Sequence, residues 1–457
     1  MHRPPLRRPL ALAAALSLAL VAGCSSTGTT ASPEQAASGT PTATSTPEPT
    51  EAAASQPRLA ITYDGGVQVL DATSLEVLGD FPFDGFARLN PAGDGRHLLV
   101  SAPGGWHSLD AGAWEQAHGD HSHYYTAEPR VTGTVFAAEE GGHVVAHAGR
   151  TVLFDDGTGQ VVAFDSADLE DPDRETREFR TPSAHHGVAV ELSDGRMVVS
   201  EGDEESRNGI RVLDADGNEI AANDQCPNVH GETVAADEVV VIGCTDGVLV
   251  YRDGQITKID SPDEYGRIGN QWGLDDSPVV VGDYRSEQDT PADAVGRISL
   301  IDTATGELRL VELPASYWYR SIGRGEDGEA VVLGTDGQLH VVDTATGTLV
   351  RSVPVMSAWE VEEDWQTPQP QVFTMEGTAY VSDPVDDKVH AVDIETGEVW
   401  ASADLSVTPN ELKGVTGSAD ENPAHDGEHG HDHAGEDHEG HDHEGEDHDH
   451  EGEQQRS

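Results

Sequence analysis

The stretch "LHVVDTATGT", Leu339–Thr348, joins a short apolar strand to a tight turn. Asp and Thr side chains initiate such a turn, and Gly supplies the positive φ that closes it. The same combination returns as "ISLIDTATGE" at residues 298–307 and as "VHAVDIETGE" at residues 389–398. A strand that recurs together with its turn indicates a fold assembled from repeated units.

The strand itself recurs along the chain, with the last residues of successive copies 38 to 55 positions apart. Upstream of most copies, "DG" or "DGR" separates two apolar strands, as in "VELSDGRMVVS". Each unit therefore contains about four short strands, and helical periodicity is absent over most of the chain. Radial repetition of four-stranded sheets predicts an all-β fold of the β-propeller class. The copies are "VQVLD" at 67, "WHSLD" at 106, "VVAFD" at 161, "IRVLD" at 210, "VLVYR" at 248, "ISLID" at 298, "LHVVD" at 339 and "VHAVD" at 389.

The two ends of the repeated region, residues 58–417, predict how the ring closes. The first unit begins at Arg58 with three obvious strands and lacks a strand on its N-terminal side. After the last unit the chain offers "SVTPNELKGVTG", residues 406–417. We expect this segment to supply the missing strand and to complete the first of eight four-stranded blades. Seven blades are the alternative if "WHSLD" belongs to an irregular insertion.

The N-terminus predicts export. Three arginines precede the apolar run "LALAAALSLALVAG", so residues 1–23 have the pattern of a signal peptide and are too short for a membrane-spanning helix. "VAGC" resembles a bacterial lipobox and predicts a lipoprotein anchored through Cys24 to the outer face of the cytoplasmic membrane. A buried cysteine in an ordinary signal peptide is the alternative. Residues 24–57 are rich in Ser, Thr and Pro, and we expect a flexible linker there.

The formal net charge of −58 argues against a nucleic-acid partner and favours cations, although solubility alone would also explain it. Part of this charge lies in residues 418–457, which have nothing apolar to fold and are expected to form a disordered tail. Imidazoles alternating with carboxylates predict weak capture of Zn²⁺, Ni²⁺, Cu²⁺ or Co²⁺, unless the tail serves solubility only. The tail histidines are His425, His429, His431, His433, His438, His441, His443, His448 and His450.

Three histidines occupy equivalent places in successive repeats. His143, His186 and His230 each stand at the start of the first strand of a unit, and in a propeller that strand lines the central channel. Three imidazoles with a carboxylate or water would complete a tetrahedral zinc site. His147 lies four residues along the strand of His143, on the same face, and is a further candidate ligand. His185 must point the other way and is expected to pack or to support a ligand.

The alternative for the channel histidines is structural, with each imidazole hydrogen-bonded to a carbonyl. Four other histidines lie inside the repeated strands or beside them, and for these we expect surface or edge-strand polar roles. They are His97, His107, His340 and His390.

An insertion after "WHSLD" carries "HGDHSHYY", residues 118–125. Asp120, His121 and His123 form an Asp-His-x-His cluster on what we expect to be a loop, with His118 close by. Alternate residues of an extended loop can chelate one ion, and loops often carry function. Folded over the channel mouth, this loop would add ligands to the channel site. A solvated polar loop without a metal is the alternative.

Cys226 and Cys244 are the cysteines that remain after Cys24. A disulfide is the default for such a pair in an exported protein, and a Cys–Cys zinc site is the alternative. Catalysis has little support, because the sequence contains no GxSxG, no HExxH, no phosphate-binding glycine loop and no dinucleotide fingerprint. We therefore expect no enzymatic activity.

The stretches "GGHVVAHAGRTVLFDDGTG", "AHHGVAV", "CPNVHGE", "IGCTDGVLVY" and "GDHSHYY" together resemble the AztD-type zinc metallochaperones. These are exported β-propeller proteins that hand zinc to the solute-binding protein of a zinc ABC importer. The resemblance spans about Pro57 to Gly417 and is strongest between His118 and Gly247. It implies a high-affinity zinc site in the propeller and a structural Cys226–Cys244 disulfide. This chain departs from the family in its lipobox and in the C-terminal position of its histidine-rich segment.

Together these features predict an extracytoplasmic zinc-binding metallochaperone, monomeric, whose partner is the zinc-binding solute-binding protein of an ABC importer. Two alternatives stay open. One is a metal-dependent propeller enzyme of the lyase or lactonase kind, which needs an open coordination position beside an acid or base. The other is a binding or structural propeller with a metal-buffering tail.

Overall fold

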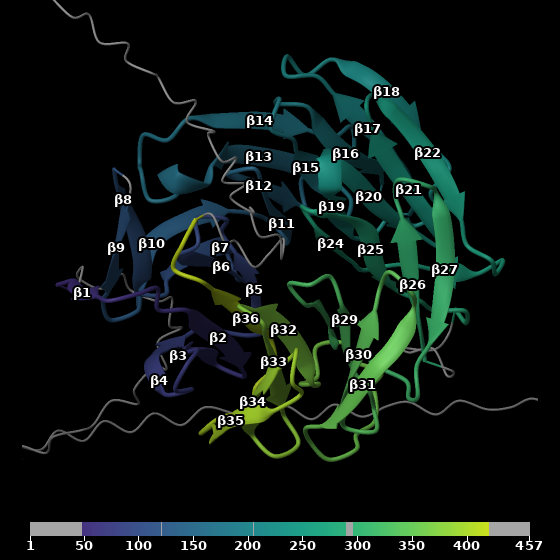
Figure 1. Cartoon of the computed structure of the whole chain (residues 1–457). Helices are drawn as coiled ribbons and strands as arrows, with labels where there is room; N and C mark the ends of the chain where they lie inside the picture. Colours follow the sequence, from purple (N-terminus) through teal and green to yellow (C-terminus); the bar gives the residue numbers. More distant parts are fainter. Residues whose placement is uncertain (1–47, 120, 204, 289–295, 420–457) are drawn as a thin grey trace, which may run out of the picture. The chain divides into compact units, whose positions relative to one another are not determined.

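Short, mostly antiparallel strands dominate the regular structure of the computed structural model, which describes residues 48–419 except 120, 204 and 289–295. In the described residues, the strands form eight sheets that follow one another around a common centre (Figure 1); seven have four strands, and one has four strands with a short fifth beside them. A further three-stranded sheet lies outside this set. The predicted eight-bladed β-propeller is confirmed, and "WHSLD" belongs to a regular blade.

The first four blades are named here in chain order, from the innermost strand to the outermost. Blade 1 contains β36 (Leu412–Val415), β2 (Arg58–Tyr63), β3 (Gly66–Asp71) and β4 (Val77–Pro82). Blade 2 contains β5 (Arg88–Pro91), β6 (His97–Ala102), β7 (Gly105–Asp110) and β10 (Arg130–Ala137). Blade 3 contains β11 (Gly141–His147), β12 (Arg150–Asp155), β13 (Gln160–Asp165) and β14 (Thr176–Arg180), with the short 3-10 helix η1 (Ser166–Asp168) after β13. Blade 4 contains β15 (Ala189–Glu191), β16 (Met197–Gly202), β17 (Arg207–Leu213) and β18 (Glu219–Asn223).

The remaining blades follow the same plan. Blade 5 contains β19 (Glu232–Ala235), β20 (Val239–Cys244), β21 (Asp246–Arg252) and β22 (Gln255–Asp260), with the 3-10 helix η2 (Ala236–Glu238) after β19 and the short strand β23 (Gly266–Arg267) beside β21. Blade 6 contains β24 (Gln271–Leu274), β25 (Ser277–Asp283), β26 (Arg297–Asp302) and β27 (Glu307–Glu312). Blade 7 contains β28 (Ile322–Arg324), β29 (Ala330–Leu333), β30 (Gln338–Asp343) and β31 (Thr348–Pro354). Blade 8 contains β32 (Gln371–Met375), β33 (Thr378–Asp383), β34 (Lys388–Asp393) and β35 (Val399–Asp404).

The ring closes in blade 1. β36 pairs antiparallel with β2, so that Arg58 faces Val415 and Ile61 faces Leu412. The C-terminal strand is therefore the innermost strand of the first blade, as the sequence predicted. Leu412 joins Leu59 and Ile61 in one buried apolar cluster with side chains of blade 8, so closure also buries apolar surface between the first and last blades.

The repeated turn has the geometry that its sequence requires. In the stretch that begins at Leu339, Asp343 Oδ1 accepts a hydrogen bond from the backbone N–H of Thr346 at 2.8 Å, and Gly347 has φ +70°. Asp393 holds the corresponding N–H of Thr396 at 2.7 Å in blade 8. The aspartate side chain thus satisfies backbone donors inside the turn and fixes the hairpin between the third and fourth strands of a blade.

The cores lie between blades. Along β30, Leu339 and Val341 pack with Val381 of blade 8, whereas Val342 on the opposite face packs with side chains of blade 6. Both faces of a blade are therefore buried. Each fully buried Val or Leu contributes about 1.5–3 kcal/mol, so stability is distributed around the ring.

This two-sided burial corrects the expectation for four histidines. Instead of lying at the surface, they are buried, with exposed fractions between 0% and 6%. His340 and His390 each have Nδ1 within 2.8 Å of a serine hydroxyl on the outermost strand of their blade. His97 Nδ1 lies 2.5 Å from Asp94 Oδ2, and His107 Nε2 lies 3.2 Å from the Pro103 carbonyl. A polar side chain on the repeated strand faces a neighbouring blade, so it needs an internal partner.

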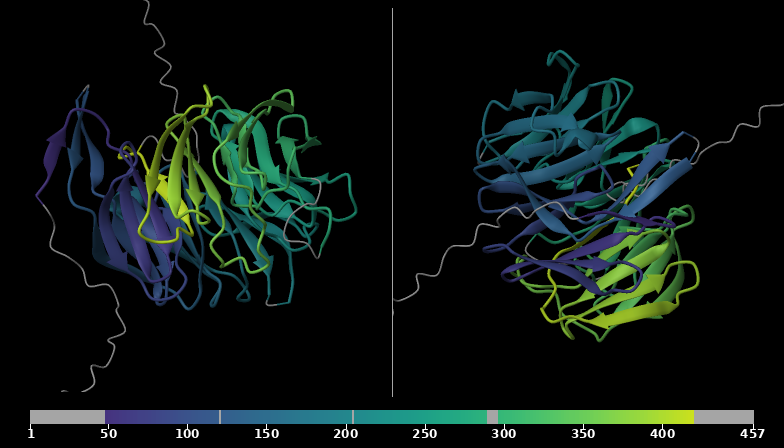
Figure 2. Two further views of the ribbon diagram at one scale, coloured as in Figure 1. Left: turned by 90° about the horizontal axis from the view of Figure 1, so that it is seen from below. Right: turned by 90° about the vertical axis from the view of Figure 1, so that its left-hand side faces the viewer.

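The insertion in blade 2 is a β-hairpin, where the sequence led us to expect a loop. It consists of β8 (Ala113–His118) and β9 (His121–Thr126), and β1 (Thr50–Ala52) pairs with β9. Trp114 and Tyr125 stack across the hairpin with ring centroids 5.6 Å apart, a cross-strand pair that favours strand over loop. Figure 2 shows this small sheet projecting from the edge of the blades. β1 falls inside the segment expected to be a linker.

Several sequence predictions concern residues outside the described part of the chain. The signal peptide at 1–23, the lipidation of Cys24 and the histidine-rich tail from residue 420 belong to this group. Within the described residues, we find no helix with the length and apolar character needed to cross a membrane.

Candidate metal centre

His143, His186 and His230 come together from three successive blades. His143 lies in β11, and the other two stand just before β15 and β19, the innermost strands of blades 4 and 5. Their ring centroids are 5.1, 5.2 and 5.7 Å apart, and one nitrogen from each ring lies within 4.8 Å of the other two. Equivalent positions on neighbouring blades converge on the inside of the ring, so the sequence pattern placed these side chains together correctly.

Each of the three imidazoles is held through Nδ1. His143 Nδ1 lies 2.9 Å from Glu232 Oε2, and His186 Nδ1 lies 2.5 Å from Asp156 Oδ2. His230 Nδ1 donates to the Gly269 carbonyl at 2.6 Å. A ring held through Nδ1–H presents the lone pair of Nε2, which is how protein histidines are oriented as metal ligands. The alternative prediction was that carbonyl groups hold all three rings. Only His230 is held in this way, and its Nε2 is not used by that hydrogen bond.

Burial and charge give the three rings different proton affinities. Burial lowers the pKa of His230 well below its usual value, and the neighbouring Arg267 guanidinium lowers it further. Burial also disfavours the charged form of His143, but the Glu232 carboxylate outweighs it and raises the pKa of that ring. His230 is therefore neutral, as a ligand must be, whereas His143 releases a proton when a cation binds.

Two glycines give the ligands room. A Cβ at Gly187, next to His186, would lie 2.1 Å from the Phe154 ring. Gly231, next to His230, has φ +72°, and a Cβ there would lie 2.3 Å from the Gly269 carbonyl oxygen that holds His230. The backbone can approach its neighbours this closely because both residues lack a side chain.

The three-histidine group opens into a cavity of about 740 Å³. A metal ion bound to three protein nitrogens would keep a coordination position toward this space for water or an incoming ligand. Besides the histidines, the cavity is lined by Arg88, Arg267, Asn270, Arg285, Gln288, Trp318, Tyr319, Arg320, Glu362, Glu363 and Trp365.

His147 and His185 lie apart from this group. His147 Nε2 lies 2.9 Å from Glu238 Oε1, and the residue lines a different cavity together with Asp94 and His97. It is four residues further along β11 than His143, about 13 Å at the rise of a strand. His185 is 3% exposed, its Nε2 accepts from the Ser200 hydroxyl at 2.9 Å, and it packs edge-on against Phe154, in keeping with the packing role expected for it.

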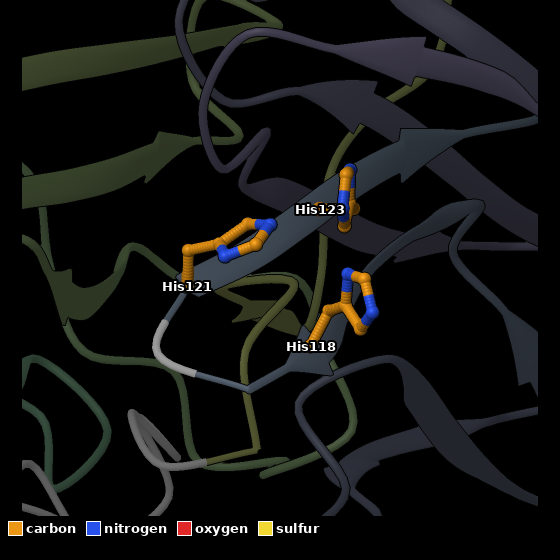
Figure 3. A group of neighbouring side chains, drawn as sticks. All are labelled: His118, His121 and His123. Atoms are coloured by element: carbon orange, nitrogen blue, oxygen red, sulfur yellow. The ribbon is translucent and has the colours of Figure 1, made fainter.

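A second group of three histidines lies on the projecting hairpin. His118 ends β8 and faces His121 across the turn, and His123 follows on β9 (Figure 3). Their ring centroids are 5.0 to 5.6 Å apart, and His123 Nδ1 lies 2.8 Å from Glu51 Oε1 of β1. His118 and His121 are exposed, so this is a surface site. Asp120, the predicted fourth member, lies outside the described residues.

Within the described part of the chain, the two groups are separate. No hairpin nitrogen belongs to the channel group, so the sequence-based idea that the insertion would add ligands to the channel site is not what the described residues show. The hairpin strands are paired in the small sheet with β1, and that pairing fixes the histidines on the hairpin itself.

Cys226 and Cys244 form a disulfide with their Cα atoms 5.0 Å apart. The pair is therefore unavailable as a zinc site. The bond ties the segment that leads to His230 to the end of β20, the strand next to β19. Closing a loop of this size contributes about 3 kcal/mol by the chain-entropy model. The disulfide thus restrains the backbone that presents one ligand.

Sequence reasoning missed the groups that orient the ligands. Asp156, Glu232, Gly269 and Arg267 act on the three rings, yet none was a candidate. With 84 acidic residues in the chain, a carboxylate near a histidine carries no signal. "FDDGTG" and "HGE" stood next to candidate ligands, but only the contact between blades 3 and 5 shows that Glu232 reaches His143.

Comparisons with known proteins agree with this picture. No protein-family model matches the chain. It is similar to the zinc chaperone AztD of Citrobacter koseri, with 23% identity over 383 residues, which cover 80% of this chain and 89% of that protein. The crystal structure of Citrobacter koseri AztD matches with a TM-score of 0.68 at 22% identity, over 80% of this chain and 99% of that one. The structure of apo AztD from the same organism gives a TM-score of 0.66 at 21% identity, over 79% and 98% of the two chains. The resemblance to these proteins that the sequence motifs indicated is thereby confirmed, and the chain shares their β-propeller fold.

Proposed function

We propose that this chain is an extracytoplasmic zinc metallochaperone, which captures Zn²⁺ and passes it to the zinc-binding solute-binding protein of an ABC importer. The observation that carries the proposal is the convergence of His143, His186 and His230: each ring is held through Nδ1, and one nitrogen from each ring lies within 4.8 Å of the other two. Imidazole nitrogen suits Zn²⁺. The similarity to a protein named as a zinc chaperone supports the choice of metal and of function.

The chemistry of hand-over follows from the open coordination position. Three nitrogens hold the cargo ion, and the fourth ligand is exchangeable because it comes from the cavity side. An acceptor that enters there can add a ligand of its own before any of the three imidazoles lets go. Transfer by such stepwise exchange never requires the free ion, and it needs no catalytic acid or base.

The hairpin group is proposed as a second, weaker zinc site. Its histidines are more exposed than those of the channel group, and a carboxylate from β1 orients His123. Water competes more strongly for an ion at an exposed site, which lowers affinity and speeds exchange. We propose that this group and the tail histidines collect Zn²⁺ for the channel site.

The cellular setting is part of the same proposal. A signal peptide and a lipidated Cys24 would hold a monomeric propeller at the outer face of the cytoplasmic membrane, with the residues after Cys24 as its linker. An anchored carrier would stay at the membrane that holds the importer it serves. The net charge of −58 opposes nucleic-acid binding.

The first prediction tests the channel site and the hand-over. In metal-free protein, His186→Ala should weaken zinc binding at least about 100-fold, measured by competition with a chromogenic chelator. His185→Gln is the matched control: its ring faces Ser200, so zinc affinity should stay as in the parent. Zinc-loaded protein mixed with the apo solute-binding protein should transfer the ion faster than it releases the ion to the chelator. Equal rates would contradict direct hand-over, and unchanged affinity in His186→Ala would contradict the site.

The same geometry also favours a second candidate function. Three histidines and an open position are also a ligand set of catalytic zinc sites, such as that of carbonic anhydrase. An activity screen of the zinc-loaded protein, with His186→Ala as the control, separates this candidate from the chaperone.

A further inference from the structure

The arginines of the cavity outside the channel site differ in how their charges are balanced. Arg88 and Arg320 are both paired with Glu411, a carboxylate that is 2% exposed. Arg285 donates to the Tyr265 hydroxyl at 3.2 Å. Three of the four guanidinium groups therefore have partners of their own. The charged residues that line the cavity are Arg88, Arg267, Arg285, Arg320, Glu362 and Glu363.

Arg267 is the exception. In the part of the chain that the structure describes, its guanidinium group has no hydrogen bond and no ion pair. It lies over Gly269 instead, where a Cβ would be 2.0 Å from Nη1, 2.5 Å from Cζ and 2.7 Å from Nη2. Asp283 fixes this turn, because its Oδ1 accepts from the Gly269 N–H at 2.6 Å. The guanidinium group thus packs on a restrained backbone, with its positive charge unpaired on the cavity wall.

The same glycine connects this charge to the metal site. The Gly269 carbonyl accepts from His230 Nδ1 at 2.6 Å, so one residue contacts both the guanidinium group and a zinc ligand. Arg267 and the three channel histidines also line one cavity. Burial and, after it, the charge of Arg267 lower the pKa of His230, so the field of the guanidinium group reaches the ring. A field that disfavours a proton on the ring also disfavours a divalent cation bound to it.

Arg207, a second guanidinium group near the ligands, is placed differently. Its Nη1 donates to the His186 carbonyl at 3.2 Å. Burial and the charge of Arg267 lower the pKa of Arg207, whereas the Asp156 carboxylate raises it. Arg207 therefore has a backbone acceptor and a compensating carboxylate, and Arg267 is left as the charge that acts against a bound cation.

We propose that Arg267 lowers the zinc affinity of the channel site by charge repulsion and thereby speeds the hand-over of the ion. This inference rests on the proposed zinc site. A carrier gives up its cargo downhill only if it binds the ion less tightly than the acceptor does, and three anchored imidazoles alone make a tight site. A fixed positive charge raises the free energy of the bound ion without removing a ligand. Because it belongs to an arginine, the charge persists over the whole physiological pH range.

Removal of the charge tests the proposal, because it should make binding tighter. In the full-length protein, Arg267→Gln and Arg267→Met should each bind Zn²⁺ about tenfold more tightly than the parent, measured by competition with a chromogenic chelator. Zinc should also leave both variants correspondingly more slowly when excess chelator is added. Damage to the fold weakens a metal site, so it cannot produce this result. Arg267→Lys keeps the charge and should stay within about threefold of the parent.

Arg180→Gln is the matched control for the change in net charge. Arg180 is exposed at the end of β14, the outermost strand of blade 3. Its replacement should change zinc affinity by less than about twofold, because salt screens an exposed and distant charge. Each neutral variant of Arg267 is also combined with His186→Ala, which removes a channel ligand and should abolish the gain. The unfolding temperature of every variant reports that it is folded.

The outcomes are distinct. Tighter binding and slower release in both neutral variants, without a gain in Arg267→Lys or Arg180→Gln, support the proposal. Unchanged or weaker binding in the neutral variants overturns it, and so does an equal gain in Arg267→Lys. A gain that persists with His186→Ala overturns it as well, because the tightened site is then not the channel site. If His186→Ala leaves the affinity of the parent unchanged, the proposed channel site fails and this inference fails with it.

Discussion

At the scale of single residues, the channel site shows how a propeller turns ordinary side chains into an oriented ligand set. The three histidines differ in what holds them: a glutamate from another blade, an aspartate from the neighbouring blade and a backbone carbonyl. In each case the anchor takes Nδ1. The anchors therefore matter as much as the ligands, because they decide which nitrogen faces the cavity.

Replacement of an anchor gives the second prediction. Asp156→Asn removes the charge that accepts from His186 Nδ1 while it keeps the size of the side chain, so His186 loses its fixed tautomer. Zinc affinity should fall about 10–100-fold, measured by chelator competition. Asp194→Asn, in an exposed turn, is the matched control. An unchanged affinity in Asp156→Asn would mean that the aspartate does not orient the ligand.

The buried pair of His97 and Asp94 gives the third prediction, on pH. Burial disfavours both charges, but their mutual attraction raises the pKa of His97 and lowers that of Asp94. The stabilisation from His97 is complete below the unfolded histidine pKa of about 6.5 and disappears as pH rises through the raised folded value. The stabilisation from Asp94 is complete above the unfolded value of 3.8 and disappears as pH falls through the lowered folded value.

His97→Gln should therefore destabilise the protein by about 1–3 kcal/mol between roughly pH 4 and 6.5, and less outside that window. Thermal unfolding of the parent and the variant from pH 3 to pH 9 measures the difference. Two more charges face this pair: the Asp110 carboxylate raises the pKa of His97, and the Arg96 guanidinium lowers it. Both residues must therefore be the same in the parent and in the variant. A difference that stays constant across the whole range would show that the pair is not ionised.

At the scale of elements, the short segments that carry the histidines need restraints that fix their backbone. The segment before β19 is restrained three times: by the Cys226–Cys244 disulfide, by the His230–Gly269 hydrogen bond and by the positive φ of Gly231. The hairpin of β8 and β9 solves the same problem differently, by stacking aromatic rings across its strands. Both elements hold histidines in place without help from a metal.

A glycine pair gives the fourth prediction. Gly231→Ala and Gly254→Ala both place a side chain at positive φ, +72° and +80°, which costs about 1–2 kcal/mol in each case. Only the first also drives a Cβ to 2.3 Å from the Gly269 carbonyl, whereas the second meets open space. Gly231→Ala should therefore lose more stability, in thermal unfolding, and should weaken zinc binding, while Gly254→Ala keeps the parent's affinity. Equal effects on affinity would show that the turn does not position His230.

At the scale of the whole molecule, the ring depends on one late strand. β36 supplies the inner edge of blade 1 and buries Leu412 against Leu59 and Ile61. The sequence predicted this dependence. The first repeat has only three strands and an additional strand follows the last repeat, which implies that the additional strand completes the first blade. The turn after Leu339 predicted the hairpin geometry for a different reason, because it is a local pattern that recurs in several blades.

Truncation gives the fifth prediction. A chain that ends at residue 408 lacks β36 and should lose roughly 5 kcal/mol or more, through lost apolar burial and lost backbone pairing. A chain that ends at residue 419 keeps every described strand and is the control. Near-UV circular dichroism and thermal unfolding compare the two. Identical unfolding temperatures would show that closure in blade 1 contributes nothing to stability.

The rest of the site was beyond sequence reasoning for physical reasons. Equivalent positions in a repeat become neighbours in a ring, so the three channel histidines were predictable. Their anchors were not, because Glu232 reaches across from blade 5 to blade 3 and no repeat rule links those positions. His340 was misjudged because alternation marks one face of a strand as exposed, yet in a propeller the next blade covers that face. The insertion was expected to be a loop because its histidines are polar. The cross-strand pair of Trp114 and Tyr125, which favours a hairpin, was not recognised in the sequence.

The order of synthesis adds a consequence of the closing strand. The innermost strand of the first blade is the last strand that the ribosome makes, so a nascent chain can build most of its sheets and still have an unsealed seam between its ends. The three channel histidines come from blades 3 to 5, whose strands are made before β36, yet the positions of these blades around the common centre are fixed only when β36 pairs with β2. A chain whose last strand is not yet made therefore holds these three imidazoles less firmly than the finished ring does.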